Sequence, residues 1–122
     1  MSTVQLGAGN FEQTITENEI VFVDFWAAWC GPCRQFAPVF EKAANDHPDM
    51  VFGKVDTEAE QVLAASAHIA SIPTLMAFKD GSLVFSQPGA LPSTALEQLI
   101  ADVEKLDVEK AGREAAARKQ SA

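Results

Sequence analysis

Cys30 and Cys33 are the two side chains best suited to chemistry in this sequence, which contains no other cysteine. They closely follow the apolar run 20–26, which is typical of a strand buried on both faces. Apolar residues then recur at helical spacing, so a helix is expected to begin close to Cys33. Unpaired N–H groups and the positive dipole end at a helix N-terminus stabilise a thiolate. We therefore expect a reversible dithiol/disulfide couple that exchanges electrons with disulfides in other proteins.

Three other uses of the cysteine pair stay open on the sequence alone. A zinc site needs four ligands, and His47 and His68 are the histidines that could be recruited to complete one. A structural disulfide would close a very short loop and add little stability. The third alternative is that both cysteines are inert buried thiols. Gly31 and Pro32 between them at a helix start argue against it, because proline suits the first turn of a helix.

Asp24 is the one charged residue in the apolar run, so a strand there would bury its carboxylate. Burial of an unpaired carboxylate raises its pKa towards neutrality. A carboxyl group with such a pKa can act as a general acid or base. Strand and helix geometry would put it beneath Cys33, within reach directly or through one water. The alternative is an ordinary ion pair, for which Lys54 is the nearest candidate.

Pro73 begins an expected strand, and two interpretations of it are compatible with the sequence. Proline at this position can mark the edge of a sheet. It can also follow a cis peptide bond in a tight turn. If this segment lies opposite the cysteines, Ile72 would offer its backbone N–H and C=O to an extended target segment.

The elements that must position these residues are strands alternating with helices. A short helix capped by Asn10 comes first, followed by a strand at 20–26 and a helix from about Cys33 to His47 that is kinked at Pro38. Next come a strand at 51–55 and a helix at 58–67, in which Val62 and Leu63 point inward. Strands at 74–78 and 83–85 surround a turn at 79–82, and a last helix is capped by Ser93. Alternation implies parallel pairing through right-handed crossovers, to which the hairpin adds antiparallel strands. The predicted fold class is α/β, with three layers.

Composition sets the domain organisation and excludes some partners. The 122 residues, 48% of them hydrophobic, suit one compact domain at residues 1–106. Residues 107–122 lack an apolar stripe and predict a helical or frayed tail. The formal net charge of −8 argues against nucleic acid or an anionic membrane surface as a partner. Without a signal-peptide pattern or an apolar run of roughly 20 residues, a cytoplasmic location is expected, where a lone cysteine pair favours redox or metal chemistry.

The segment 26–33, which reads Trp-Ala-Ala-Trp-Cys-Gly-Pro-Cys, resembles the active-site segment of thioredoxins. The resemblance covers about residues 5–106 and includes Asp24, Pro38 and the segments 72–74 and 89–90. It implies the thioredoxin fold, in which helices flank a central mixed β-sheet, and a monomeric protein.

The resemblance also implies a role for each matching residue. Cys30 corresponds to the attacking and more exposed cysteine, and Cys33 to the resolving, more buried one. Asp24 corresponds to the buried acid that assists proton transfer to and from Cys33. Pro73 corresponds to the family's cis-proline. The residues expected to contact the target are Trp29, Gly31, Pro32, Ile72, Pro73 and Gly89.

The function implied is that of a cytosolic protein-disulfide reductase with no bound cofactor and no metal. Its partners would be disulfide-containing target proteins and thioredoxin reductase, which would supply electrons from NADPH. Two alternatives are a scaffold domain that binds a partner without turnover, and an oxidase or isomerase. The second is disfavoured by Pro32, since disulfide-forming relatives usually carry histidine before the second cysteine.

Three departures from the family pattern are expected to matter. Phe52 falls where many members carry a lysine close to the buried aspartate. Pro88 occupies a groove position where a β-branched residue is common. The tail after Leu106 exceeds the usual family length.

Overall fold

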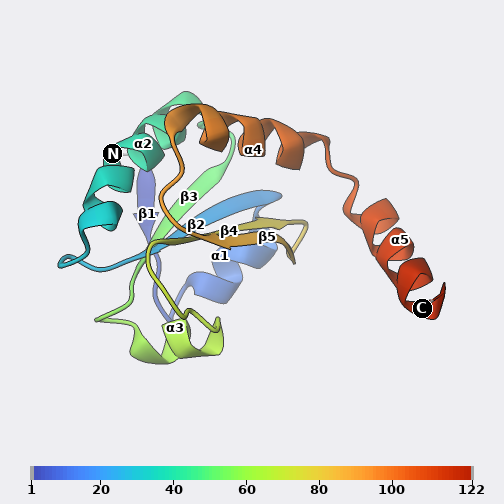
Figure 1. The fold of residues 1–122 in the computed structure, drawn as a ribbon, viewed down its shortest axis with the longest axis horizontal. Helices are drawn as coiled ribbons and strands as arrows, with labels where there is room; N and C mark the ends of the chain where they lie inside the picture. The colour runs from blue at the N-terminus through green and yellow to red at the C-terminus, as the bar shows by residue number, and fades with distance from the viewer. Residues whose placement is uncertain (1, 122) are drawn as a thin grey trace.

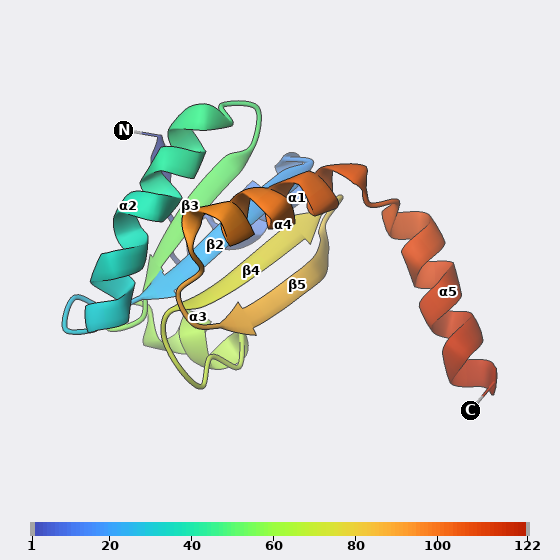
Figure 2. The ribbon, with the colours of Figure 1, turned by 45° about the horizontal axis from the view of Figure 1, so that its top comes forward.

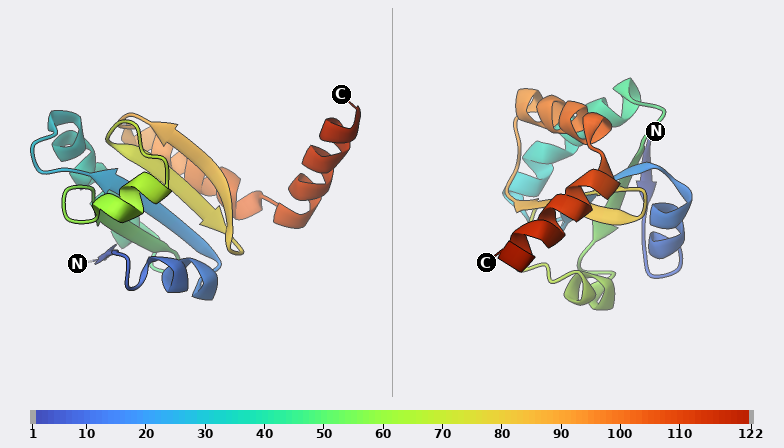
Figure 3. Two further views of the ribbon diagram at one scale, coloured as in Figure 1. Left: turned by 90° about the horizontal axis from the view of Figure 1, so that it is seen from below. Right: turned by 90° about the vertical axis from the view of Figure 1, so that its right-hand side faces the viewer.

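Five strands form one mixed sheet with the order β1-β3-β2-β4-β5 in the computed structural model, which describes residues 2–121 (Figures 1 and 2). The elements are β1 (Thr3–Gln5), α1 (Phe11–Glu17), β2 (Ile20–Trp26), α2 (Gly31–Asp46), β3 (Val51–Asp56), α3 (Gln61–Ser66), β4 (Thr74–Lys79), β5 (Ser82–Pro88), α4 (Ser93–Lys105) and α5 (Val108–Ser121). β3 runs parallel to both β1 and β2, whereas β4 is antiparallel to β2 and β5. Helices α2 and α4 cover one face, and α1 and α3 cover the other (Figures 1 and 3). The predicted three-layer α/β class is confirmed.

The central strand β2 separates two apolar clusters, because its successive side chains point to opposite faces. Phe22 packs with Phe36, Phe40 and Phe52 under α2 and α4, and the Phe22 and Phe52 ring centroids are 5.2 Å apart. On the other face, residues 21, 23 and 25 pack under α1 and α3. Burial on both faces explains why this segment is almost continuously apolar.

Strand β1 was not predicted from the sequence, because three residues carry too little pattern to identify a strand. It adds to the edge of the sheet in parallel with β3, with Thr3 opposite Phe52. Immediately after β1, Leu6 packs so closely over Gly53 that a Cβ there would lie 2.2 Å from a Leu6 side-chain atom. Gly53 therefore allows this segment to close over β3.

The helix predicted at 58–67 is shorter than expected and is confined to α3. Asp56 Oδ1 accepts the backbone N–H of Glu58, which holds residues 56–59 in a turn. Val62 is 80% exposed, so the prediction that it points inward is wrong, whereas Leu63 packs against the core.

The two predicted helix caps also differ from the structure. Ser93 is the first residue of α4 and Pro92 is the cap, with no side-chain hydrogen bond. Asn10 does precede α1, but its Oδ1 accepts the N–H of Gly7 and does not cap the helix, whose first N–H, that of Phe11, donates to the Gly7 carbonyl oxygen at 2.9 Å. Pro38 lies inside α2, which continues to Asp46.

A buried lysine fixes the end of α4. Lys79 Nζ donates hydrogen bonds of 2.8, 2.8 and 2.9 Å to the carbonyl oxygens of Val103, Glu104 and Leu106, which satisfies carbonyls that a helix C-terminus leaves unpaired. After this point the chain turns, and α5 extends away from the sheet (Figure 1). Residue 122, the end of the predicted tail, lies outside the described residues. Among residues 2–121, no helix has the length and apolarity to cross a membrane.

Candidate redox site

Cys30 and Cys33 form a disulfide at the start of α2, directly after the turn that follows β2. Cys30 is the N-cap residue, and its Sγ accepts the backbone N–H of Cys33 at 3.2 Å. The sulfur therefore lies at the end of the helix where unpaired N–H groups favour negative charge. Both cysteines are buried, with exposed fractions of 4% and 3%, so the disulfide form does not show the expected difference in exposure between them.

The segment around Pro73 lies against Cys30. The Ile72–Pro73 peptide bond is cis, as the resemblance implied. Cys30 Sγ is 3.7 Å from the Ile72 carbonyl oxygen. Gly89 donates its N–H to the Pro73 carbonyl oxygen at 2.8 Å and has a φ of +105°, which favours glycine. The fold thus brings together residues that are about 40 to 60 positions apart in the chain.

Two polar residues that the sequence did not single out, Glu58 and Arg34, form hydrogen bonds with the segment that precedes the disulfide. Trp29 is 68% exposed, and its Nε1 donates a hydrogen bond of 2.5 Å to Glu58 Oε1. Arg34 Nη1 donates to the Ala28 carbonyl oxygen at 2.8 Å. Glu58 follows β3, and parallel strands β2 and β3 end at the same edge of the sheet, so topology was the signal that could have identified it.

Asp24 is fully buried in β2, and neither carboxylate oxygen has a hydrogen-bond partner among the described residues. Desolvation raises the pKa of Asp24 to about 7, although the positive charge of Lys54 partly offsets this. Near neutral pH the carboxyl group is therefore divided between its acid and base forms. That is the condition under which a carboxyl group can both give and take a proton.

Lys54 is directly opposite Asp24 in the β2–β3 pairing, whereas Phe52 is opposite Phe22. The prediction that Phe52 stands in the lysine position is therefore wrong. The error arose because the register of a strand cannot be read from its own residues. Lys54 does not form an ion pair with Asp24 within the described part of the chain. Its Nζ instead lies 5.1 Å from the centroid of the Trp26 ring, a cation–π geometry.

The remaining predicted residues occupy the surroundings of this site. Gly31 and Pro32 form the first turn of α2 between the cysteines. Pro88 ends β5 opposite Thr74 and is exposed. His47 contacts Glu97 on α4 at 2.8 Å, and within residues 2–121 no cluster of three or more His, Cys, Asp or Glu side chains could hold a metal ion. The zinc alternative thus gains no support.

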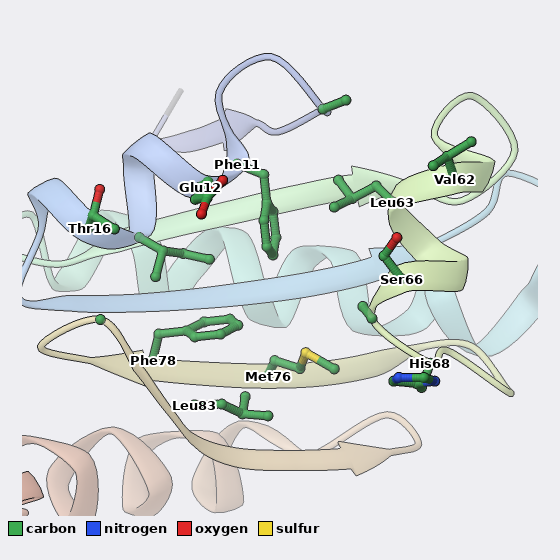
Figure 4. Close-up of a pocket in the computed structure, with 14 residues that line it drawn as sticks. Phe11, Glu12, Thr16, Val62, Leu63, Ser66, His68, Met76, Phe78 and Leu83 are labelled. Carbon is green, nitrogen blue, oxygen red and sulfur yellow. The ribbon is translucent and has the colours of Figure 1, made fainter.

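A groove of about 610 Å³ opens elsewhere, between α1, α3 and strands β4 and β5 (Figure 4). Its lining is mainly apolar and includes Phe11, Leu63, Met76 and Phe78. None of the predicted catalytic or target-contacting residues lines it, whereas His68, a candidate for the zinc alternative, does. The disulfide instead lies beside an exposed tryptophan at the surface, an arrangement that suits a macromolecular substrate better than a small molecule.

Comparisons with known proteins agree with this geometry. The thioredoxin family model matches residues 2–102. Putative thioredoxin 2 of Streptomyces coelicolor is 56% identical over 120 residues, which cover 98% of this chain and 89% of that protein. Thioredoxin of Alicyclobacillus acidocaldarius is 44% identical over 103 residues, covering 84% and 98%. The solved structure of a mutant thioredoxin from Halobacterium salinarum superposes with a TM-score of 0.81 at 31% identity, covering 87% of this chain and 94% of its own.

The chain therefore belongs to the thioredoxin family. This explains the disulfide at a helix start, the cis-proline beside it and the mixed sheet. It is a thiol-disulfide oxidoreductase, and its Cys30/Cys33 couple acts as a protein-disulfide reductase. Members of this family generally act on disulfides of other proteins and carry no prosthetic group.

Proposed function

We propose that the two cysteines act in a fixed order. The Cys30 thiolate attacks one sulfur of a target disulfide, which forms a mixed disulfide and releases the first target thiolate. The Cys33 thiolate then attacks Cys30 Sγ, which forms the intramolecular disulfide and releases the second target thiolate. The target gains two electrons and the protein loses two. The position of Cys30 as the N-cap of α2, where its sulfur accepts the Cys33 N–H, is the observation that carries this proposal.

Asp24 takes the proton of Cys33 before the second step and returns one when the disulfide is reduced again. Its burial and its pKa of about 7 support this role, because both protonation states are then accessible near neutral pH. The two carboxylate oxygens are free to accept a hydrogen bond, directly or through a water, since neither has a partner among the described residues.

The target binds as an extended segment across the surface formed by Trp29, Gly31, Pro32, Ile72, Pro73 and Gly89. The Ile72 carbonyl oxygen lies 3.7 Å from Cys30 Sγ, so a strand paired with Ile72 would bring its own disulfide next to the attacking sulfur. Backbone pairing encodes little sequence information, which fits a reductase with many targets.

Family membership and composition support a proposal for the wider setting. Electrons come from NADPH through thioredoxin reductase, and the protein works as a monomer in the cytoplasm. The net charge of −8 argues against nucleic acid or anionic membranes as partners. Residues 1–106 form the redox domain, and residues 107–122 form an appended tail.

Insulin reduction tests the order of attack. With NADPH and thioredoxin reductase, the intact protein is expected to precipitate reduced insulin chains, which turbidity measures. Cys30→Ser should abolish turnover and form no mixed disulfide with a target. Cys33→Ser should also abolish turnover but accumulate a mixed disulfide at Cys30, visible as a mass increase that a thiol reductant removes. A mixed disulfide at Cys33 in the Cys30→Ser variant, with none at Cys30 in the other, would reverse the assignment.

A further inference from the structure

Three consecutive backbone carbonyl groups beside the disulfide have different partners. The Ser71 carbonyl oxygen accepts the Thr74 hydroxyl at 2.6 Å, and the Pro73 carbonyl oxygen accepts the Gly89 N–H at 2.8 Å. The Ile72 carbonyl oxygen between them accepts no N–H or O–H group of residues 2–121, and the Ile72 N–H has no acceptor there. The fold thus anchors the carbonyl on each side of Ile72 and leaves the two backbone groups of Ile72 available to a ligand.

The anchor on Ser71 comes from a side chain of the sheet. Thr74 is the first residue of β4 and is 6% exposed, so its hydroxyl has a fixed position. In many β-turns the first carbonyl accepts the backbone N–H of the fourth residue. In the bend at 71–74, the Ser71 carbonyl oxygen has the Thr74 hydroxyl as its one hydrogen-bond partner within residues 2–121. The hydroxyl therefore takes the place of a backbone hydrogen bond that would close this bend.

We infer that Thr74 is a positioning residue for target binding: its hydroxyl, through the Ser71 carbonyl, holds the N–H and C=O of Ile72 in the orientation in which an extended target segment pairs with them. The Ile72 carbonyl oxygen lies 3.7 Å from Cys30 Sγ, so its orientation decides where a paired target places its own disulfide. A segment that is already ordered binds more tightly, because the target does not have to order it. The inference rests on the proposed function, in which the target pairs with Ile72.

The cysteines themselves have no hydrogen bond with Thr74 in the described part of the chain. The hydrogen bond to Cys30 Sγ comes from the Cys33 N–H, and the Thr74 hydroxyl donates to Ser71. In the pairing of β4 with β2, Thr74 is opposite the apolar Phe25. Loss of the hydroxyl should therefore leave the reactivity of the Cys30 thiolate unchanged and affect only those substrates that pair with the backbone.

The test compares three mixed disulfides of thionitrobenzoate in their reaction with the reduced protein. One is formed with free cysteine, one with a cysteine inside an extended peptide, and one with the same peptide methylated on the backbone nitrogens beside its cysteine. Thr74→Val removes the hydroxyl and keeps the side-chain shape, whereas Thr74→Ser keeps the hydroxyl. Thr16→Val on α1 is the control, because the Thr16 hydroxyl also donates to a carbonyl three positions earlier, that of Gln13 at 3.1 Å. The absorbance of released thionitrobenzoate measures each rate.

The wild type is expected to react faster with the unmethylated peptide than with the methylated one. Thr74→Val should slow the reaction with the unmethylated peptide by about fivefold, the factor that one neutral hydrogen bond contributes, through KM and not through the maximal rate. Its rate with free cysteine disulfide should match that of the wild type. Thr74→Ser and Thr16→Val should keep wild-type rates with all three substrates.

Two results would overturn the inference. Thr74→Val could react with the unmethylated peptide at the wild-type rate, or it could lose the same factor with the free cysteine disulfide, which would mean that the hydroxyl acts on the sulfur. A different result would refute the proposed function: a wild type that reacts equally with both peptides does not pair its target with Ile72, and the inference would then fall with that pairing.

Discussion

The raised pKa of Asp24 lowers the stability of the folded protein at neutral pH, although the same raised pKa suits the proton transfer that we propose. Its pKa is raised from 3.8 to about 7, so the unfolded chain releases this proton at lower pH than the folded protein does. Between about pH 4 and pH 7 the folded state binds more protons, and stability therefore falls as pH rises through this window. Below pH 4 both states are protonated, and the destabilisation disappears. Above about pH 4 the buried carboxyl group therefore costs stability, which fits the proton-transfer role that we propose for Asp24.

Replacing Asp24 with Asn should remove this pH dependence. We expect the variant to be more stable than the wild type at pH 8 by a few kcal/mol at most, and to differ little at pH 4. Urea unfolding of the oxidised proteins at the two pH values measures the difference. The same variant should reduce insulin more slowly and lose the rate change around pH 7. A wild type whose stability rises from pH 4 to pH 8 more than that of the variant would contradict this account.

At the scale of elements, Lys79 connects β4 to the end of α4. Its three carbonyl partners belong to the last turn of the helix and the residue after it, so one side chain closes the C-terminus of α4 over the sheet. This buried ammonium has no carboxylate partner among residues 2–121. It is tolerated because carbonyl oxygens and the negative end of the helix dipole surround it.

Lys79→Met should destabilise the protein by about 1–3 kcal/mol, because buried carbonyls lose charged hydrogen bonds and the apolar stem alone is conserved. Lys105→Met is the matched control, since Lys105 is exposed in the last turn of α4 and should change stability little. The midpoint of urea unfolding at an unchanged slope measures both effects. Equal midpoints for the two variants would show that Lys79 does not secure the helix.

For the whole molecule, we propose that the division between domain and tail falls just after α4. The family model match ends at residue 102, α4 ends at Lys105, and α5 begins at Val108. Val108 and Ala111 line a cavity together with Leu83 and Val84 of β5, and α5 extends away from the sheet (Figure 1).

A chain that ends after Asp107 should fold and reduce insulin at the rate of the full chain. Its thermal midpoint should fall by no more than a few degrees, since little apolar surface is uncovered and the Lys79 contacts are kept. Circular dichroism and the insulin assay measure the two properties. Loss of cooperative unfolding, or a severalfold loss of rate, would mean that the tail belongs to the domain.

The sequence predicted most of the fold because the signals were local. The run 20–26 required a strand buried on both faces, and the apolar spacing after Cys33 required a helix. Short elements were predicted poorly. β1 was not predicted and the limits of α3 were wrong, because three and six residues are too few for a periodic pattern to define an element. Helix caps were assigned from residue type, which identifies a candidate but not the backbone conformation that decides the boundary.

The sequence by itself determined the chemistry: two cysteines at the start of a helix and one carboxylate in a buried strand follow from residue type and local periodicity. Only the tertiary structure decided what surrounds them. Three contacts join residues that are far apart in the chain: Cys30 with Ile72, Trp29 with Glu58, and Lys54 with Trp26. Strand register, which depends on packing across the whole sheet, put Lys54 and not Phe52 opposite Asp24.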